Sequence, residues 1–219
     1  MSVSRWRYGD SWERYPITEG EVWSHRPSGS RIAVADIREP LPDFMREADM
    51  VYTDPPWSKG NANSFVTKAG FDTYVTSFDE FMDSLFARIQ EIGPRACYLE
   101  IGKQHRQDFT DRLQALFPVV QEWPIVYYRK HPCFLLRGGE QEVPADLAGL
   151  DDEETPGAAI AAERPECVAD LCTGRGLTLL AAHARGARFV GTELNRRRLA
   201  VAIERAAKVG VAYAKDLVQ

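Results

Sequence analysis

The sequence has few cysteines and histidines, and their spacing excludes several common kinds of site. The four cysteines, Cys97, Cys133, Cys167 and Cys172, form no Cys-x-x-Cys pair, and the four histidines are scattered. This spacing contains no zinc pattern, so we predict no metal site. Cys97, Cys133 and Cys167 lie in or beside apolar runs, where we expect reduced, buried and unreactive thiols.

Long apolar runs are also missing. No stretch approaches the roughly 20 residues that a membrane span needs, and the N-terminal MSVSRWRYGD lacks the apolar centre of a signal peptide. No internal repeat has the period of a solenoid or propeller. We therefore expect a globular protein without membrane contact, by default cytoplasmic. Its 219 residues are enough for one sizeable domain with a core.

The net charge of −5 argues weakly against nucleic-acid binding, but the charge is unevenly spread. Residues 140–154 hold seven acids and no lysine or arginine, so this segment carries −7 and the rest of the chain +2. One acidic loop therefore makes the net charge negative, so the net charge does not exclude a phosphate-bearing partner.

Strands alternate with helices along most of the chain, after a Trp-, Tyr- and Arg-rich segment, residues 1–30, that we interpret as an irregular arm. The predicted strands are residues 32–34, 50–52, 96–101, 125–128, 133–136, 166–171 and 188–190, with 125–136 forming a hairpin. The predicted helices are residues 77–92, 104–117, 157–162, 177–184 and 196–209. This alternation predicts a mostly parallel α/β sheet covered by helices on both faces.

The stretch TDPPW, residues 53–57, follows the apolar run 50–52. An unpaired carboxylate at the end of a buried strand is costly, and two prolines cannot join a sheet. One interpretation is a Pro-Pro turn with Asp54 as a cap and Trp57 in the core. The other is a rigid site that holds Asp54 and the Pro55 carbonyl as hydrogen-bond acceptors.

Residues 166–195 have the order strand, Gly-x-Gly turn, helix, strand, acid. Gly174 and Gly176 allow close backbone approach where a ligand would meet the helix N-terminus, and Glu193 can accept hydrogen bonds from ribose hydroxyls. Leu179 replaces the third glycine of a dinucleotide motif, and Asp170 would repel a phosphate but suits a cation. These details favour a nucleoside without a pyrophosphate, although such turns also occur without a ligand.

The chain has DPPW first, then D-x-x-x-G-x-G, and then a Glu at the end of a strand. This order of motifs resembles that of the permuted, β-class-like DNA adenine-N6 amino-methyltransferases that use S-adenosyl-L-methionine. The resemblance spans residues 31 to about 209. It implies a Rossmann-like methyltransferase fold with a mostly parallel seven-stranded sheet, a β-hairpin and a circularly permuted motif order. The single domain would then be residues 31–219, with a catalytic half, 31–137, an acidic loop, 138–156, and a cofactor-binding half, 157–219.

The resemblance also implies a set of cofactor-binding residues. They are Asp36, Asp54, Thr155, Asp170, Leu171, Cys172, Thr173, Gly174, Gly176, Glu193 and Leu194. The sequence departs from the family pattern at three places. Ala35 replaces a glycine before Asp36, residues 171–173 stand where Pro-Phe and a small residue are frequent, and Arg175 interrupts the turn.

The proposed catalytic residues are Asp54, Pro55, Pro56 and Trp57. An exocyclic amine on a purine is a poor nucleophile because its lone pair is delocalised, and acceptors on its hydrogens free that pair. Trp57 offers a face on which a flipped base can stack, worth about 1–3 kcal/mol. By the family pattern, the leading Asp favours adenine over cytosine N4.

Substrate contacts are expected from Lys59, Asn61, Arg129, Lys130 and His131, and residues 58–76 are expected to form a mobile loop over the base. Sequence-specific relatives usually carry a recognition domain where this chain has only its acidic loop. The protein would then read a short site, use a homodimer or a separate specificity partner, or methylate something other than duplex DNA. The alternatives are the same chemistry on RNA or cytosine N4, a non-catalytic nucleic-acid-binding subunit, and a Rossmann-type nucleotide binder.

Overall fold

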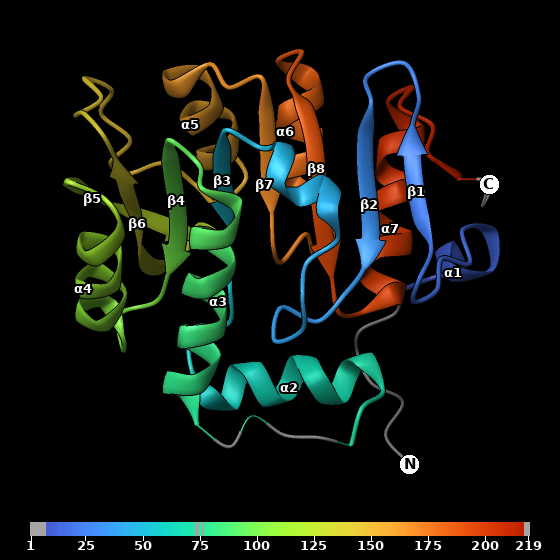
Figure 1. Ribbon diagram of the computed structural model, residues 1–219, viewed down its shortest axis with the longest axis horizontal. Helices are drawn as coiled ribbons and strands as arrows, with labels where there is room; N and C mark the ends of the chain where they lie inside the picture. Colours follow the sequence, from blue (N-terminus) through green and yellow to red (C-terminus); the bar gives the residue numbers. More distant parts are fainter. Residues whose placement is uncertain (1–7, 73–74, 76, 217–219) are drawn as a thin grey trace.

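The computed structural model describes residues 8–72, 75 and 77–216, and its strands form one mixed sheet (Figure 1). In spatial order the strands run β5-β6-β4-β3-β7-β8-β2-β1-β9. Their bounds are β1 (Val22–His25), β2 (Ser30–Val34), β3 (Met50–Thr53), β4 (Ala96–Ile101), β5 (Val119–Tyr127), β6 (His131–Gly139), β7 (Cys167–Asp170), β8 (Arg188–Glu193) and β9 (Ala214–Lys215).

The middle of this sheet is parallel and its flanks are antiparallel. β4, β3, β7, β8 and β2 pair in parallel, whereas β6 and β5 on one side and β1 and β9 on the other pair antiparallel. The predicted α/β class and the hairpin over residues 125–136 are confirmed. The prediction of seven, mostly parallel strands was wrong, because the described residues form nine strands in a mixed sheet.

The extra strands come from the chain ends. Residues 22–25, which we interpreted as part of an irregular arm, form β1, and a short turn lets β1 pair antiparallel with β2. Trp23 is 8% exposed and belongs to the core. Residues 11–14 form the short helix α1 (Ser11–Arg14), which packs on α7 (Arg196–Lys208). Residues 1–7 of the expected arm lie outside the described residues.

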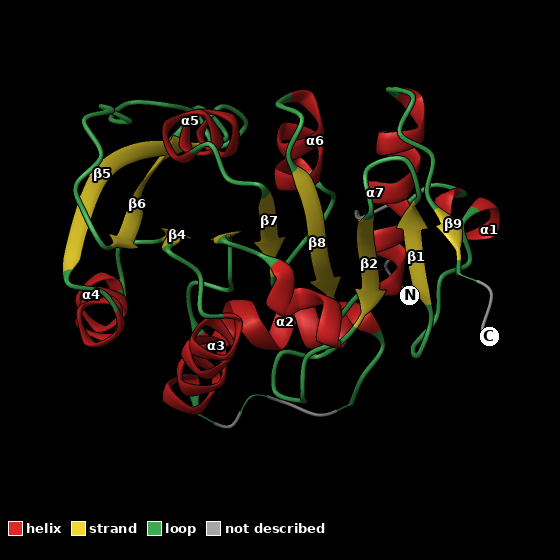
Figure 2. Ribbon diagram, turned by 45° about the horizontal axis from the view of Figure 1, so that its top comes forward, coloured by secondary structure: helices red, strands yellow, loops and turns green. Residues whose placement is uncertain are grey.

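Helices cover both faces of the sheet (Figure 2). The 3-10 helix η1 (Asp43–Glu47), α3 (Phe78–Ile92) and α4 (Arg106–Leu116) bury apolar side chains on one face. On the other face, α5 (Thr155–Glu163), α6 (Leu177–Ala184) and α7 do the same. None of the helices in the described residues is long and apolar enough to cross a membrane.

The segment after DPPW is helical where we expected a mobile loop. α2 (Lys59–Ala69) begins after Ser58, whose side chain accepts a hydrogen bond from the Asn61 amide, and ends at Gly70 with φ of +96°. These are ordinary helix-capping contacts. Figure 1 shows α2 lying across the carboxyl ends of the parallel strands. The expected loop over residues 58–76 was therefore wrong for residues 59–69, and α2 covers the edge where the site residues gather.

Candidate active site

A cavity of about 360 Å³ opens at the carboxyl edge of the sheet, and residues of α2 form part of its lining. β3 lies between β4 and β7 in the sheet, so two groups of side chains meet there. We call residues after β3 and at the end of β4 the DPPW side, and residues after β7 and β8 the glycine-turn side. Ligands of open α/β sheets bind in such a crevice beyond the carboxyl ends of the strands.

Asp54 and Trp57 form the centre of the DPPW side. The Trp57 indole Nε1 lies 2.8 Å from Asp54 Oδ1 and 3.1 Å from the Glu100 carbonyl oxygen. The Trp57 backbone N–H donates to Asn61 Oδ1 at 3.2 Å. Ser58, rather than Asp54, caps the following helix. Asp54 is thus held in place by the indole and lines the cavity.

The carboxyl group of Asp54 is open to the cavity, and the cavity walls displace much of the water around it. This desolvation raises the pKa of Asp54 to about 7, with further increases from the nearby Asp170 and Asp152. The Trp57 hydrogen bond and the charge of Arg198 act in the opposite direction. Asp54 therefore changes its charge near neutral pH.

Glu100 and Asp152 are site residues that the motif analysis did not identify. Glu100 is 2% exposed, and Tyr52 Oη lies 3.3 Å from its Oε2. Burial, then the charges of Asp54 and Asp152, raise the pKa of Glu100 well above its usual value. Asp152 is 3% exposed, and burial raises its pKa to about 6. The signal for Glu100 was present, because it is the charged residue of an otherwise apolar strand.

Aromatic rings continue from Trp57 towards the surface. The Trp57 and Tyr127 rings are 4.9 Å apart at 65°, and those of Tyr127 and Tyr128 are 4.3 Å apart. Tyr128 is 56% exposed, has φ of +49°, and donates its backbone N–H to Asp152 Oδ1 at 3.0 Å. A Cβ on Gly102 would lie 2.7 Å from Trp57 Cε3, so Trp57 occupies space that only a glycine leaves.

On the glycine-turn side, backbone amides hold the carboxylates. Gly174 N–H donates to Glu193 Oε2 at 2.7 Å, and Asn195 N–H donates to Glu193 Oε1 at 2.8 Å. Cys172 N–H donates to Asp170 Oδ1 at 3.0 Å. Burial nevertheless raises the pKa of Asp170 to about 6, and the charge of Glu193 adds to this increase. Each oxygen of Glu193 keeps a lone pair for a further donor.

Two arginines also line the cavity, Arg38 after β2 and Arg198 in α7. Arg38 binds Asp36 through Nε at 3.0 Å and through Nη2 at 2.5 Å. Arg198 lines the cavity and lies over the Phe65 ring of α2, 4.7 Å from its centroid. Asp36 is thus paired with a cation, and neither arginine was predicted as a site residue.

The cavity brings together most of the residues predicted from the sequence. Those that line it are Asp36, Asp54, Pro55, Pro56, Trp57, Asn61, Asp170, Leu171, Cys172, Thr173, Gly174, Glu193 and Leu194. The other predicted residues, Thr155, Gly176, Lys59, Arg129, Lys130 and His131, are absent from this lining.

Two of the predicted cofactor residues outside the lining have structural contacts. Thr155 is fully buried, and its Oγ1 lies 2.8 Å from the Tyr52 hydroxyl. Gly176 has φ of +79°, and a Cβ there would lie 2.9 Å from Ala202 Cβ. Gly176 therefore allows the turn to pack closely against α7.

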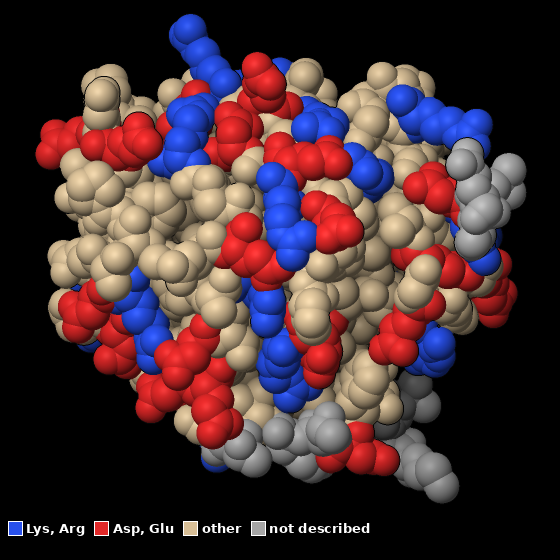
Figure 3. Space-filling view, viewed as in Figure 1, with Lys and Arg blue, Asp and Glu red and all other residues tan. Residues whose placement is uncertain are grey.

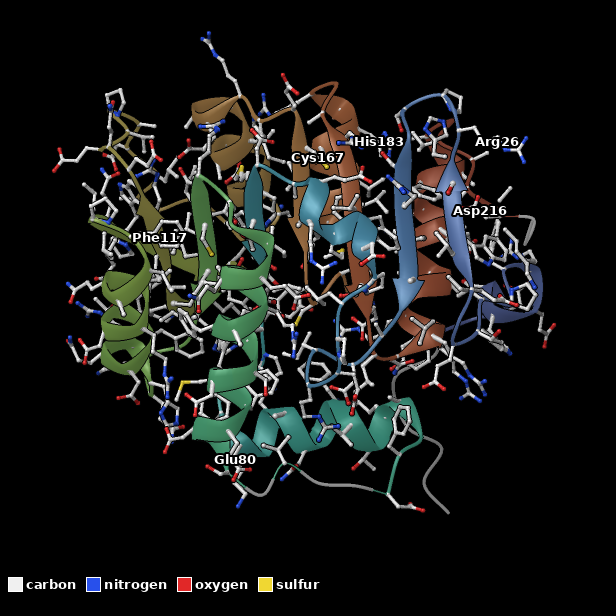
Figure 4. The ribbon with its side chains drawn as sticks, viewed as in Figure 1. Arg26, Glu80, Phe117, Cys167, His183 and Asp216 are labelled. Atoms are coloured by element: carbon white, nitrogen blue, oxygen red, sulfur yellow. The ribbon has the colours of Figure 1, made fainter. Side chains whose placement is uncertain are left out.

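The predicted buried thiols are confirmed for Cys97, Cys133 and Cys167. Burial raises the pKa of Cys167 to about 11, which keeps it protonated. Cys167 begins β7, so it lies at the opposite end of that strand from the cavity (Figure 4). These thiols take no part in the candidate site.

Acidic and basic side chains are interspersed on the face that carries η1 and α3 (Figure 3). Several of them form ion pairs, for example Arg31 with Glu47 at 2.5 Å and Arg46 with Asp43 at 2.5 Å. Cations paired in this way neutralise few phosphates. This face is therefore not a continuous basic surface.

No protein-family model and no curated protein matches the sequence. Solved structures do match. The M1.HpyAVI–SAM complex aligns with a TM-score of 0.57 at 16% identity, covering 80% of this chain and 98% of that chain. TTHA0409 from Thermus thermophilus, complexed with S-adenosyl-L-methionine, aligns with a TM-score of 0.56 at 18% identity, covering 81% of this chain and 94% of that chain.

A third match is the cytosine-N4-specific PvuII DNA methyltransferase, with a TM-score of 0.54 at 11% identity, covering 79% of this chain and 84% of that chain. At these identities the likeness concerns the fold. The chain therefore has the α/β fold that M1.HpyAVI, TTHA0409 and the PvuII DNA methyltransferase share.

Proposed function

We propose that the protein is an S-adenosyl-L-methionine-dependent DNA methyltransferase that methylates the N6 amine of adenine. The observation that carries this proposal is the position of Asp54, which faces the same cavity as the Gly174 turn and Glu193. The motif order, with DPPW before the glycine turn, supports a permuted member of the amino-methyltransferases.

The chemistry of the cavity fits the proposed cofactor. S-adenosyl-L-methionine has a ribose, a sulfonium cation and an ammonium group, and it supplies an electrophilic methyl group when bound. Glu193 has spare acceptor capacity for ribose hydroxyls, and Gly174 provides a close backbone approach. Asp170 is a buried carboxylate beside this turn, which suits a cationic ligand.

On the DPPW side, this chain's residues would activate and orient the target base. Ionised Asp54 accepts a hydrogen bond from the exocyclic amine, and the Pro55 carbonyl accepts the second. Both acceptors draw electron density towards the amine nitrogen, which makes its lone pair available for direct transfer. The two prolines fix the acceptors, and the Trp57 indole fixes the Asp54 carboxylate by its hydrogen bond at 2.8 Å.

The target base would leave the duplex stack to reach Asp54. Trp57, Tyr127 and Tyr128 provide aromatic surfaces between the cavity and the solvent. Stacking on such rings contributes about 1–3 kcal/mol per base. Arg129 and Lys130 follow Tyr128, with His131 next in the chain, so the β5–β6 turn would place two cations near the phosphates that flank the flipped base. Arg129 Nε lies 4.0 Å from Asp151 Oδ2 and would exchange this partner for a phosphate.

Cytosine N4 is the second candidate target, because the fold also matches a cytosine-N4-specific enzyme. The short segment between β6 and α5 leaves no room for a recognition domain within this part of the chain. Target choice would then depend on the cavity edge, on a second copy of the chain or on a separate specificity subunit.

A transfer assay tests the proposal. The protein is incubated with tritiated S-adenosyl-L-methionine and either unmethylated DNA or RNA, and the nucleosides are then identified by mass spectrometry. We expect N6-methyldeoxyadenosine from DNA. N4-methyldeoxycytidine or N6-methyladenosine from RNA would reassign the substrate, and cofactor binding without transfer to either polymer would support a non-catalytic subunit.

A further inference from the structure

Glu100 combines deep burial with an incomplete set of partners. Its side chain is 2% exposed, lines the cavity and leaves Oε1 without a hydrogen-bond partner among the described residues. The Tyr52 hydroxyl lies 3.3 Å from Oε2, but the same hydroxyl lies 2.8 Å from Thr155 Oγ1 and has only one proton to donate. Glu100 therefore receives at most one shared hydrogen bond from these side chains.

The charged groups that act most strongly on Glu100 are all acids. Neighbouring titratable groups are Asp54 and Tyr52 of the β3 segment, Asp151 and Asp152 before α5, Tyr127 of β5 and Cys133 of β6. Glu100 makes no salt bridge with any residue that the structure describes. An ionised carboxylate in such a place would lack both donors and countercharge, so the protonated acid is the favoured form.

Glu100 belongs to the DPPW side of the cavity. β4 pairs with β3 on the edge opposite to β7, which carries the glycine turn. Its backbone carbonyl accepts from the Trp57 indole that also binds Asp54. The acids that act on Glu100 are Asp54, Asp152 and Asp151, and none of them belongs to the glycine-turn side.

We infer that Glu100 is a base-reading residue, a neutral carboxylic acid that donates a hydrogen bond from Oε1 to the ring nitrogen beside the target amine. This inference rests on the proposed function. Asp54 would accept from the amine while Glu100 donates to the adjacent ring nitrogen. The pair thus presents one acceptor and one donor side by side, as a complementary base does.

This pattern defines a substrate class. Adenine has an amine beside the acceptor N1, and cytosine has an amine beside the acceptor N3, so both fit an acceptor next to a donor. Guanine has N1–H and a carbonyl oxygen at that edge, which would face the wrong groups. A mismatched polar group in a buried site is costly, so the acid would reject guanine.

The hydrogen bond would also protect the ring nitrogen. The in-plane lone pair of N1 is not delocalised into the ring, so N1 competes with the amine for a methyl group. A donor on N1 occupies that lone pair and leaves the amine as the available nucleophile. The methyl group would then go to the exocyclic nitrogen: an N–C bond forms as the methyl–sulfur bond of the sulfonium donor breaks, the donor leaves as a neutral thioether, and the nitrogen releases one proton to solvent.

The test compares wild type, Glu100→Gln and Glu100→Ala on DNA copied with dATP or with 1-deaza-dATP, in which a C–H replaces N1. Gln is nearly isosteric and keeps a donor, so we expect Glu100→Gln to retain kcat/KM within about threefold, whereas Glu100→Ala loses about 10- to 100-fold on ordinary DNA. On 1-deazaadenine DNA, wild type and Glu100→Ala should be equal. Glu142→Gln, an exposed acid of the acidic loop, is the matched control and should equal wild type on both.

Three results would overturn the inference. One is a Glu100→Gln variant as inactive as Glu100→Ala, which would mean that the negative charge is needed. Another is a loss in Glu100→Ala that persists on 1-deazaadenine DNA. The third is weaker binding of S-adenosyl-L-methionine by Glu100→Ala in calorimetry, which would place Glu100 in the cofactor site. If wild type methylates cytosine instead, 3-deazacytosine DNA takes the place of the adenine analogue.

A spectroscopic measurement separates this inference from the proposed function. The infrared difference between wild type and Glu100→Gln at neutral pH should show the carbonyl band of a protonated carboxyl group. If that band is present but wild type transfers no methyl group to any DNA, the proposed function fails, whereas the inference that Glu100 is protonated at neutral pH is upheld. If transfer occurs and the band is missing, the proposed function stands and the inference about Glu100 fails.

Discussion

The two sides of the cavity hold their carboxylates in different ways. On the glycine-turn side, Glu193 receives two backbone N–H groups and Asp170 receives one. On the DPPW side, Asp54 receives the Trp57 indole, and Glu100 shares a tyrosine hydroxyl. The first side is built by main-chain geometry and the second by side chains.

In the proposed function, this difference separates cofactor binding from chemistry. Carboxylates fixed by backbone amides keep their position and offer their remaining lone pairs to a ligand, as a binding site requires. Asp54, which receives one indole N–H, has a pKa of about 7, so a small change in its surroundings alters its charge near neutral pH. We therefore expect substitutions on the two sides to affect different measurements.

The largest effect is expected from Asp54→Ala. It removes the proposed acceptor for the target amine, and kcat should fall about 10³-fold, as for other groups that stabilise developing charge. Calorimetry should show unchanged binding of S-adenosyl-L-methionine, because the glycine-turn side stays intact. Transfer within tenfold of wild type would remove Asp54 from the mechanism.

Glu193→Ala should have the converse effect. The substitution removes the proposed acceptor for ribose hydroxyls and frees the amides of Gly174 and Asn195, so the Kd for the cofactor should rise about 10- to 100-fold. At saturating cofactor, kcat should recover. Glu166→Ala, an exposed acid just before β7, is the control and should bind normally. A loss of kcat that saturation does not restore would break the division between the two sides.

Gly102→Ala probes the support of the DPPW side. The new Cβ would meet Trp57 Cε3 at 2.7 Å, so the indole must shift from the position in which it binds Asp54. We expect kcat to fall about tenfold, since misplacement of a positioned group by about 1 Å can cost up to 100-fold. Cofactor affinity should be unchanged. Thermal unfolding near that of wild type would show that the loss comes from the site.

The smallest effect is a shift of the pH profile. With its pKa near 7, Asp54 becomes protonated as the pH falls, so kcat/KM should decline below about pH 7. Asp152→Asn removes a negative charge that raises the pKa of Asp54. The decline of kcat/KM at low pH should therefore move to lower pH, by less than about one unit. A decline that moves to higher pH would contradict this electrostatic account.

The raised pKa of Asp54 also affects the stability of the fold. The pKa of Asp54 is higher in the fold than its ordinary value of 3.8, so the folded state keeps a proton that the unfolded chain has released. The contribution of Asp54 to stability therefore decreases as the pH rises from 3.8 to about 7. This is the direction expected of a group kept for chemistry at some cost in stability.

Local sequence patterns predicted much of the glycine-turn side. Asp170, Gly174 and Glu193 lie on one continuous strand-turn-helix-strand unit, whose geometry depends on neighbours in the chain, and all three line the cavity. The prediction failed for β1 and for α2. The hairpin of β1 with β2 and the Ser58 cap of α2 are local features that the sequence analysis missed. The pairing of β1 with β9 and the position of α2 over the carboxyl edge depend instead on contacts distant in sequence.

By itself, the sequence determined the α/β alternation, the hairpin of β5 and β6, and the motif residues that end β3, β7 and β8. Tertiary structure alone decided that Glu100, Tyr127 and Asp152 surround Asp54, since they come from a neighbouring strand, the hairpin and the acidic loop. The physical reason is that a periodic pattern records which face of an element is buried. The charge state of a buried carboxyl group depends instead on which donors and charges the fold brings around it.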